Sequence, residues 1–158
     1  MKKLKLPPDI REQYDLLLVD GAARWPAFEK RFTAAFTSAW RRLVDNERTT
    51  LLESWGKWRK GKKPQVWVKF VDALPSEAWT AYEPTGGIFT LAVPRCLPMP
   101  DELFAVFIAH EVLRAMRVAQ GVALRDSLIE EQHISLANAQ AGYNEEAMQQ
   151  WIDMRAPR

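Results

Sequence analysis

The sequence has little from which to build a disulfide, a thiolate metal site or a membrane span. Cys96 is the only cysteine in 158 residues, which excludes an internal disulfide and a Cys-rich zinc site. No apolar stretch approaches the length that crosses a bilayer. The basic start at residues 1–3 lacks the apolar run of a signal peptide, because Lys5, Pro7 and Pro8 interrupt it. We therefore expect a cytoplasmic protein without a membrane partner.

Charge of one sign is not in excess either. The 22 Lys and Arg residues are nearly balanced by 20 Asp and Glu, so the net charge of +2 does not by itself indicate nucleic acid. Internal repeats and low-complexity segments are absent. Apolar residues make up 47% of the chain and seven are Trp, enough to fill one core. We expect one domain over residues 1–158, with an N-terminal helical part at 9–62 and a second part at 64–152.

The N-terminal part is predicted to be helical. Residues 1–8 resemble a frayed leader, and Asp9 can cap a helix to about Val19. A longer helix is expected over residues 24–56, with a possible break at Asp45–Asn46. Its apolar stripe has spacings of four and three residues. The stripe consists of Phe28, Phe32, Phe36, Trp40 and Leu43.

From residue 65 the hydrophobic period changes to that of strands. Residues 65–71, QVWVKFV, alternate as in a half-buried strand. Residues 78–82 and 88–93 are predicted to form a hairpin around the turn EPTGG. These segments predict a small three-stranded sheet.

Residues 101–121 are predicted to form a buried central helix, because the first half is apolar almost all round. This helix carries His110 and Glu111 side by side, and Arg114 follows one turn later. Zinc peptidases use HExxH on a helix, where the two imidazoles share one face and the Glu is the general base. The motif here is HEVLR, and a guanidinium has no lone pair to give to zinc.

Two further helices are expected after Gly121. The first begins at Asp126 or Ser127 and ends at Gly142, and the second is capped by Asn144. With the N-terminal helices and the sheet, these elements predict an α+β fold.

Residues 65–151 resemble the zincin family, the small single-domain zinc metallopeptidases. The resemblance rests on the hairpin arm IFTLAV, the helix AHEVLRAMRVAQG, the following acids and the tail GYNEEAMQQW. It implies that His110 matches a zinc ligand, Glu111 the general base and Glu131 the third ligand. Arg114 stands where the second His belongs. The hairpin matches the sheet edge along which such enzymes lay an extended peptide.

The substitution at Arg114 leaves the ligand set one short, and two solutions are considered. Glu130 is a less favoured candidate than Glu131 for the third ligand. His133 could be recruited, but it follows Glu131 by two residues and so lies about 200° away on a helix. Alternatively, Arg114 can pair with Glu131 or Glu111 and replace the zinc as their counter-charge.

The favoured hypothesis is a degenerate, metal-free zincin-like protein that binds a peptide or protein partner and needs no cofactor. The alternative is an active zinc metallopeptidase that uses His110, Glu131 and a recruited ligand such as His133. The sequence leaves open whether the protein is an enzyme.

A third hypothesis concerns residues 55–63, where five Lys and Arg are interleaved with Trp55 and Trp58. Cations mixed with aromatics can bind a nucleic-acid backbone and stack on bases. The same pattern can be a solvated linker whose cations suit the end of a helix. We favour the linker, because the run is short.

Overall fold

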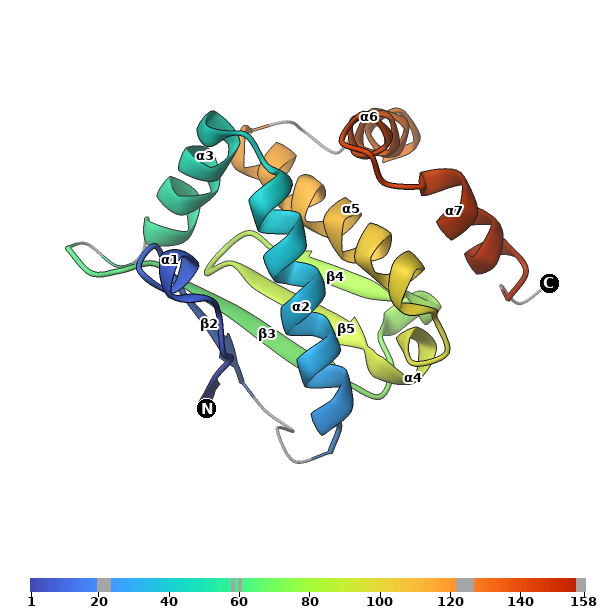
Figure 1. Ribbon diagram of the computed structural model, residues 1–158, viewed down its shortest axis with the longest axis horizontal. Coiled ribbons are helices and arrows are strands. Elements are labelled where there is room, and N and C mark those ends of the chain that lie inside the picture. The colour runs from blue at the N-terminus through green and yellow to red at the C-terminus, as the bar shows by residue number, and fades with distance from the viewer. Residues whose placement is uncertain (20–23, 58, 60, 122–126, 156–158) are drawn as a thin grey trace.

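A five-stranded mixed sheet is the framework of the molecule (Figure 1). The structure is a computed structural model and describes residues 1–19, 24–57, 59, 61–121 and 127–155. Three parallel strands, β2, β3 and β5, lie between two antiparallel edge strands, β1 and β4, in the order β1-β2-β3-β5-β4. The strands are β1 (Lys2–Lys3), β2 (Asp15–Leu18), β3 (Gln65–Val71), β4 (Thr80–Glu83) and β5 (Ile88–Ala92).

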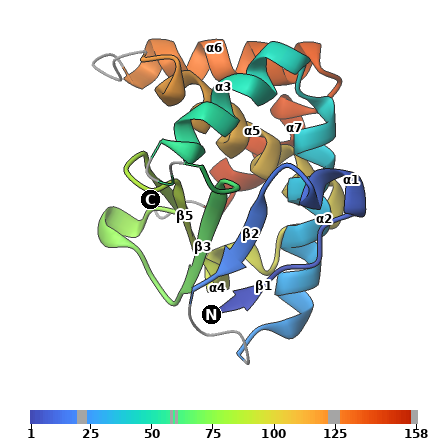
Figure 2. The same cartoon turned by 90° about the vertical axis from the view of Figure 1, so that its left-hand side faces the viewer.

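Helices α2, α3 and α5 lie on one face of this sheet, and α6 and α7 lie beyond α5 (Figure 1; Figure 2). A short 3-10 turn at Pro75–Glu77 leads into β4. The helices are α1 (Pro8–Arg11), α2 (Pro26–Arg42), α3 (Asp45–Gly56), α4 (Val93–Cys96), α5 (Asp101–Ala119), α6 (Ser127–Gln140) and α7 (Glu145–Asp153). The expected α+β class is thereby confirmed.

The aromatic stripe of α2 attaches that helix to the sheet. The ring centroids of Phe28 and Phe32 lie 5.0 and 5.7 Å from that of Phe70 on β3. Phe36 makes the equivalent contact, 5.7 Å, with Phe89 on β5. These edge-on contacts bury large apolar rings between the two layers. The predicted stripe therefore forms the core.

Several predicted boundaries are confirmed. The long N-terminal helix is broken near residue 45, where the Val44 N–H donates to the Glu47 carboxylate at 2.9 Å and caps α3. The hairpin forms from β4 and β5, with positive φ at Gly86 and Gly87. At the C-terminus, the side chain of Asn144 accepts from the backbone N–H of Ala147 and caps α7.

The prediction of a three-stranded sheet is wrong, because two N-terminal strands were not expected. The predicted helix over residues 9–19 is helical only at Pro8–Arg11, and Asp15–Leu18 forms β2. All four residues of β2 are buried, so the strand shows no alternation and cannot be distinguished from a buried helix by its pattern.

Residues 1–8 are also more ordered than a frayed leader. Lys2–Lys3 pair with β2, and Leu4 and Leu6 are buried in the core. Residues 9–62 are therefore not a purely helical part, because they share one sheet with the rest of the chain. Gly142 follows α6 at positive φ, as expected for a helix stop, whereas Asp126 lies outside the described residues.

We expect Gly87→Ala to lower the free energy of unfolding by about 3 kcal/mol. Gly87 has φ +63°, and an added Cβ would lie 2.7 Å from the buried ring of Trp55. Gly61→Ala is the matched control: its φ of +70° is similar, but no atom of the described residues lies within 4 Å of the added Cβ. Gly61→Ala should lower the free energy of unfolding by only about 1 kcal/mol, the cost of placing an alanine at positive φ. Urea unfolding compares the two variants, and equal losses would show that contact with Trp55 is unimportant.

Candidate functional site

Helix α5 carries the HEVLR motif through the interior of the protein. His110 and Glu111 are each 6% exposed, because α2 and the sheet cover one side of α5 and α6 and α7 cover another. Arg114, one turn later, lies partly at the surface with 28% of its side chain exposed. The motif therefore places two buried ionisable groups beside a cation that reaches solvent.

His110 lies between two carboxylates from different helices. Its Nδ1 is 2.7 Å from Oε1 of Glu145 on α7, and its Nε2 is 2.7 Å from Oε2 of Glu131 on α6. An ionised carboxylate can only accept, so the ring has to donate from both nitrogens. Burial alone would lower the pKa of His110, but the hydrogen bonds to Glu131 and Glu145 raise it to about 9. His110 is therefore an imidazolium at neutral pH.

Arg114 joins the remaining oxygens of the same group. Its Nη1 donates to Oε1 of Glu131, while Nε and Nη2 donate to the two oxygens of Glu111 at 3.2 and 3.3 Å. Both partners proposed for Arg114 from the sequence are thus found. Burial alone would raise the pKa of Glu131, but the hydrogen bond from His110 and the charge of Arg114 lower it. We call His110, Glu111, Arg114, Glu131 and Glu145 the ion network.

Asn138 on α6 supports the Glu145 side of the network. Its Nδ2 donates to Oε1 of Glu145 at 2.7 Å and to the carbonyl of Val106 at 3.2 Å. Asn138 is 1% exposed, and its Oδ1 has no hydrogen-bond partner among the described residues. The Asn138 side chain thus connects α6 to α5 and α7 beside the contact between His110 and Glu145.

Two residues considered from the sequence lie outside the network. Glu130 accepts from Arg117 at 2.6 and 2.9 Å, and this hydrogen bond lowers the pKa of Glu130. His133 lies 3.5 Å from Glu130 and is exposed. Because α6 is helical over this segment, Glu131 reaches His110, whereas Glu130 reaches Arg117 and His133 lies beside Glu130. The structure therefore does not bring His133 to the other candidate ligands.

Glu145 and Asn138 were missed by sequence reasoning. Glu145 follows the cap residue Asn144 and looks like an acid that suits a helix start. Its contact with His110 spans 35 positions, so no local spacing signals it. The one available hint is general: a histidine that binds a metal commonly donates its other N–H to a carboxylate.

The residues as they stand do not fit a catalytic zinc ion. Such an ion takes three protein ligands and one open position. Nε2 of His110 instead carries a proton toward Glu131, and Arg114 donates to the other oxygen of Glu131. In the described part of the chain, no group of three or more His, Cys, Asp or Glu side chains is arranged to hold a metal ion.

Strand β4 is an edge of the sheet beside α5. The backbone N–H of Ala92 donates to the carbonyl of Trp79, so residues 79 and 92 form a hydrogen-bonded pair. In an antiparallel ladder such pairs alternate, and Ala81 is therefore bonded to β5. The backbone groups of Thr80 and Tyr82 point away from β5, toward the free edge.

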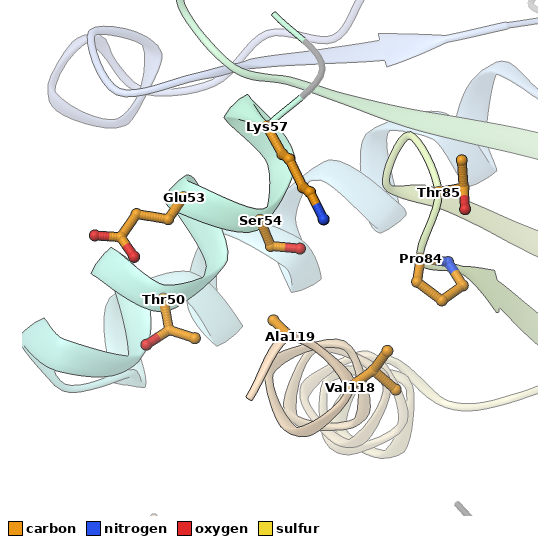
Figure 3. Close-up of a pocket in the computed structure, with 8 residues that line it drawn as sticks. All are labelled: Thr50, Glu53, Ser54, Lys57, Pro84, Thr85, Val118 and Ala119. Atoms are coloured by element: carbon orange, nitrogen blue, oxygen red, sulfur yellow. The ribbon is translucent and has the colours of Figure 1, made fainter. Parts of the chain in front are cut away.

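A cavity of about 410 Å³ lies where β4 and α5 both end (Figure 3). Val118 on its wall follows Arg114 by four residues and so lies on the same side of α5. Ser54 of α3 and Lys57, which directly follows α3, point toward the cavity, whereas Glu53 points away from it (Figure 3). The lining residues are Thr50, Glu53, Ser54, Lys57, Pro84, Thr85, Val118 and Ala119.

The proposed stacking role of Trp55 is wrong. Trp55 is 1% exposed, stacks on Trp40 at 5.6 Å, and donates from Nε1 to Oη of Tyr82 at 3.1 Å. It is a core residue and presents no face to a base. Trp58 and Lys60 lie outside the described residues.

Comparisons with known proteins give no relative: no family model, curated protein or solved structure matches the chain. No helix among the described residues is both long and apolar enough to cross a membrane. Function therefore rests on the geometry of the ion network, the β4 edge and the surfaces around them.

We expect the ion network to make stability depend on pH in the alkaline range. Because folding raises the pKa of His110 from 6.5 to about 9, its contribution is complete below about pH 6.5 and is lost as the pH rises through 9. The shift corresponds to about 3 kcal/mol. Urea unfolding of the wild type and of His110→Gln at about pH 6 and pH 10 measures it. The variant should lack this loss, and parallel losses in the two proteins would contradict the assignment.

Proposed function

We propose that this protein is a metal-free zincin-like metallopeptidase homologue that binds an extended peptide segment of a partner protein. The observation that supports this most is Arg114, which donates to the candidate base Glu111 and to the candidate ligand Glu131. A guanidinium thus takes the position of counter-charge between these two carboxylates.

The charges of the ion network nearly balance without a metal. Three carboxylates, Glu111, Glu131 and Glu145, face two cations, His110 and Arg114. Buried carboxylates are costly unless they are paired and hydrogen-bonded, and each of these three accepts from at least one cation. The network is therefore suited to hold α5, α6 and α7 together rather than to activate a water molecule.

The sheet supplies the surface for a peptide. Thr80 and Tyr82 present backbone donors and acceptors at the β4 edge, and a peptide in extended form can pair with them as an added strand. The rings of Trp79 and Trp151, 6.0 Å apart, lie at the start of β4. The cavity beside Pro84 and Thr85 lies at its end (Figure 3). A peptide along β4 would run from the Trp pair to this cavity, past the ion network.

We expect Arg114→His to create zinc affinity. The new imidazole would lie at i+4 from His110 on the same face, and the cation that holds Glu131 would be gone. Elemental analysis after incubation with zinc and desalting should find about one zinc per chain in the variant.

Arg114→Gln is the matched control, because it removes the cation without adding a ligand. It should bind no zinc. A folded Arg114→His protein without zinc would contradict a site derived from a zincin. Hydrolysis of casein by the wild type that chelators abolish would instead support the active zinc peptidase.

We expect Thr80→Pro to weaken peptide binding at least tenfold. Proline removes the outward N–H of residue 80, while the ladder between Ala81 and β5 needs no donor there. Peptides selected from a library of displayed unstructured dodecapeptides are the probe, and isothermal titration calorimetry gives their affinities.

Ala81→Thr is the control for this experiment. It alters an exposed side chain on β4 and keeps the backbone groups of the edge, so affinity should stay within about twofold of wild type. Peptides that bind Thr80→Pro as well as the wild type would show that the β4 edge is not the binding surface.

A further inference from the structure

The face of the sheet turned away from α2 and α5 is not crossed by any helix in the described part of the chain (Figure 2). In β3, Val66, Val68 and Phe70 are buried under the helices, whereas Trp67 and Lys69 alternate with them and are half-buried on the other face. We call this second side the open face. Its residues can be placed from the strand register.

An apolar row crosses the middle of the open face. Trp67 is opposite the buried Leu17 of β2 on one side and the partly exposed Ile88 of β5 on the other. Neighbouring strands lie about 4.8 Å apart, so this row extends over about 10 Å. The aromatic ring at its centre is large enough to stack with one base.

Cations lie at the Leu17 end of this row and on both sides of Trp67 along β3. Lys3 of β1 is opposite Leu17, and Lys69 lies in the next row beside Trp67. Lys63, just before β3, lies 3.1 Å from Asp15 and donates to the carbonyl of Arg11 at 2.9 Å. Lys3 also faces Asp15, at 3.7 Å, so one carboxylate is shared by two lysines.

The basic area continues around the sheet edge. A cavity of about 460 Å³ beside β1 is lined by four cations, Lys2, Lys3, Lys5 and Arg11, and by two acids, Asp15 and Glu29. The whole chain has the same asymmetry, since residues 1–63 hold 15 of the 22 Lys and Arg but 8 of the 20 Asp and Glu. In contrast, Glu83 lies at the opposite edge of the open face, on β4.

We propose that the open face binds single-stranded nucleic acid. Lys3, Arg11, Lys63 and Lys69 would bind backbone phosphates, and Trp67 would stack with a base. One aromatic ring with cations around it suits a single strand of nucleic acid, which carries both phosphate charges and flat bases. A folded acidic protein would match the cations but would leave Trp67 without a specific partner. In this proposal Trp67 is the stacking residue, because Trp55 is buried in the core.

The test is fluorescence anisotropy with a fluorescein-labelled dT15 oligonucleotide and the full chain. We expect micromolar binding at 50 mM salt that weakens about thirty- to fifty-fold by 200 mM, as release of counterions from about four phosphates implies. Lys69→Glu should weaken binding at least tenfold. Lys30→Glu, on the exposed side of α2, makes the same change of charge and should alter binding by less than threefold.

A second readout isolates stacking. Binding of dT15 should quench tryptophan fluorescence in the wild type and much less in Trp67→Phe, with folding checked by thermal unfolding. Equal losses in Lys69→Glu and Lys30→Glu would overturn the proposal, because they would mean unspecific charge attraction. Absence of binding at 50 mM salt, equal affinity for duplex DNA, or unchanged quenching in Trp67→Phe would overturn it as well.

Discussion

Arg114 connects carboxylates on α5 and α6, and His110 connects the same α6 carboxylate to one on α7, so the three helices meet through charge as well as apolar contact. The packing of the C-terminal half depends on this arrangement. Helix α5 is covered on most sides, and the buried His110 and Glu111 in its middle require partners from outside the helix. Removing one partner from a buried ion pair commonly costs about 3–5 kcal/mol, because the other charge stays buried.

The ion network also determines which chemistry the site can support. A zinc site needs deprotonated ligands that share an open centre. Here Glu131 and Glu145 stabilise the protonated imidazole, and Arg114 fills the space between Glu111 and Glu131. The same residues that would suit a metallopeptidase therefore stabilise one another. This physical difference underlies the proposal of a binding protein.

The two surfaces proposed to bind partners differ in chemistry. The β4 edge offers backbone hydrogen bonds beside α5, with the Trp79–Trp151 pair at one end and a polar cavity at the other. The open face offers the ring of Trp67 and nearby cations, two of which, Lys3 and Lys63, pair with Asp15. Both surfaces belong to one sheet, but the β4 edge would bind through main-chain atoms and the open face through side chains. One ligand could thus bind without displacing the other.

The sequence alone determined the elements with a strong period and clear ends: the stripe of α2, the alternation of β3, the β4–β5 hairpin, and α5 with HEVLR on it. Local spacing suffices there, because 3.6-residue and two-residue periods place side chains directly. Only the tertiary structure decided that Asp15–Leu18 is a strand, since its four residues are all buried and show no hydrophobic period. It also decided that Glu131 rather than Glu130 meets His110, and that Glu145 and Asn138 join them. These contacts connect residues 7 to 35 positions apart across three helices, and their distances depend on how the helices pack.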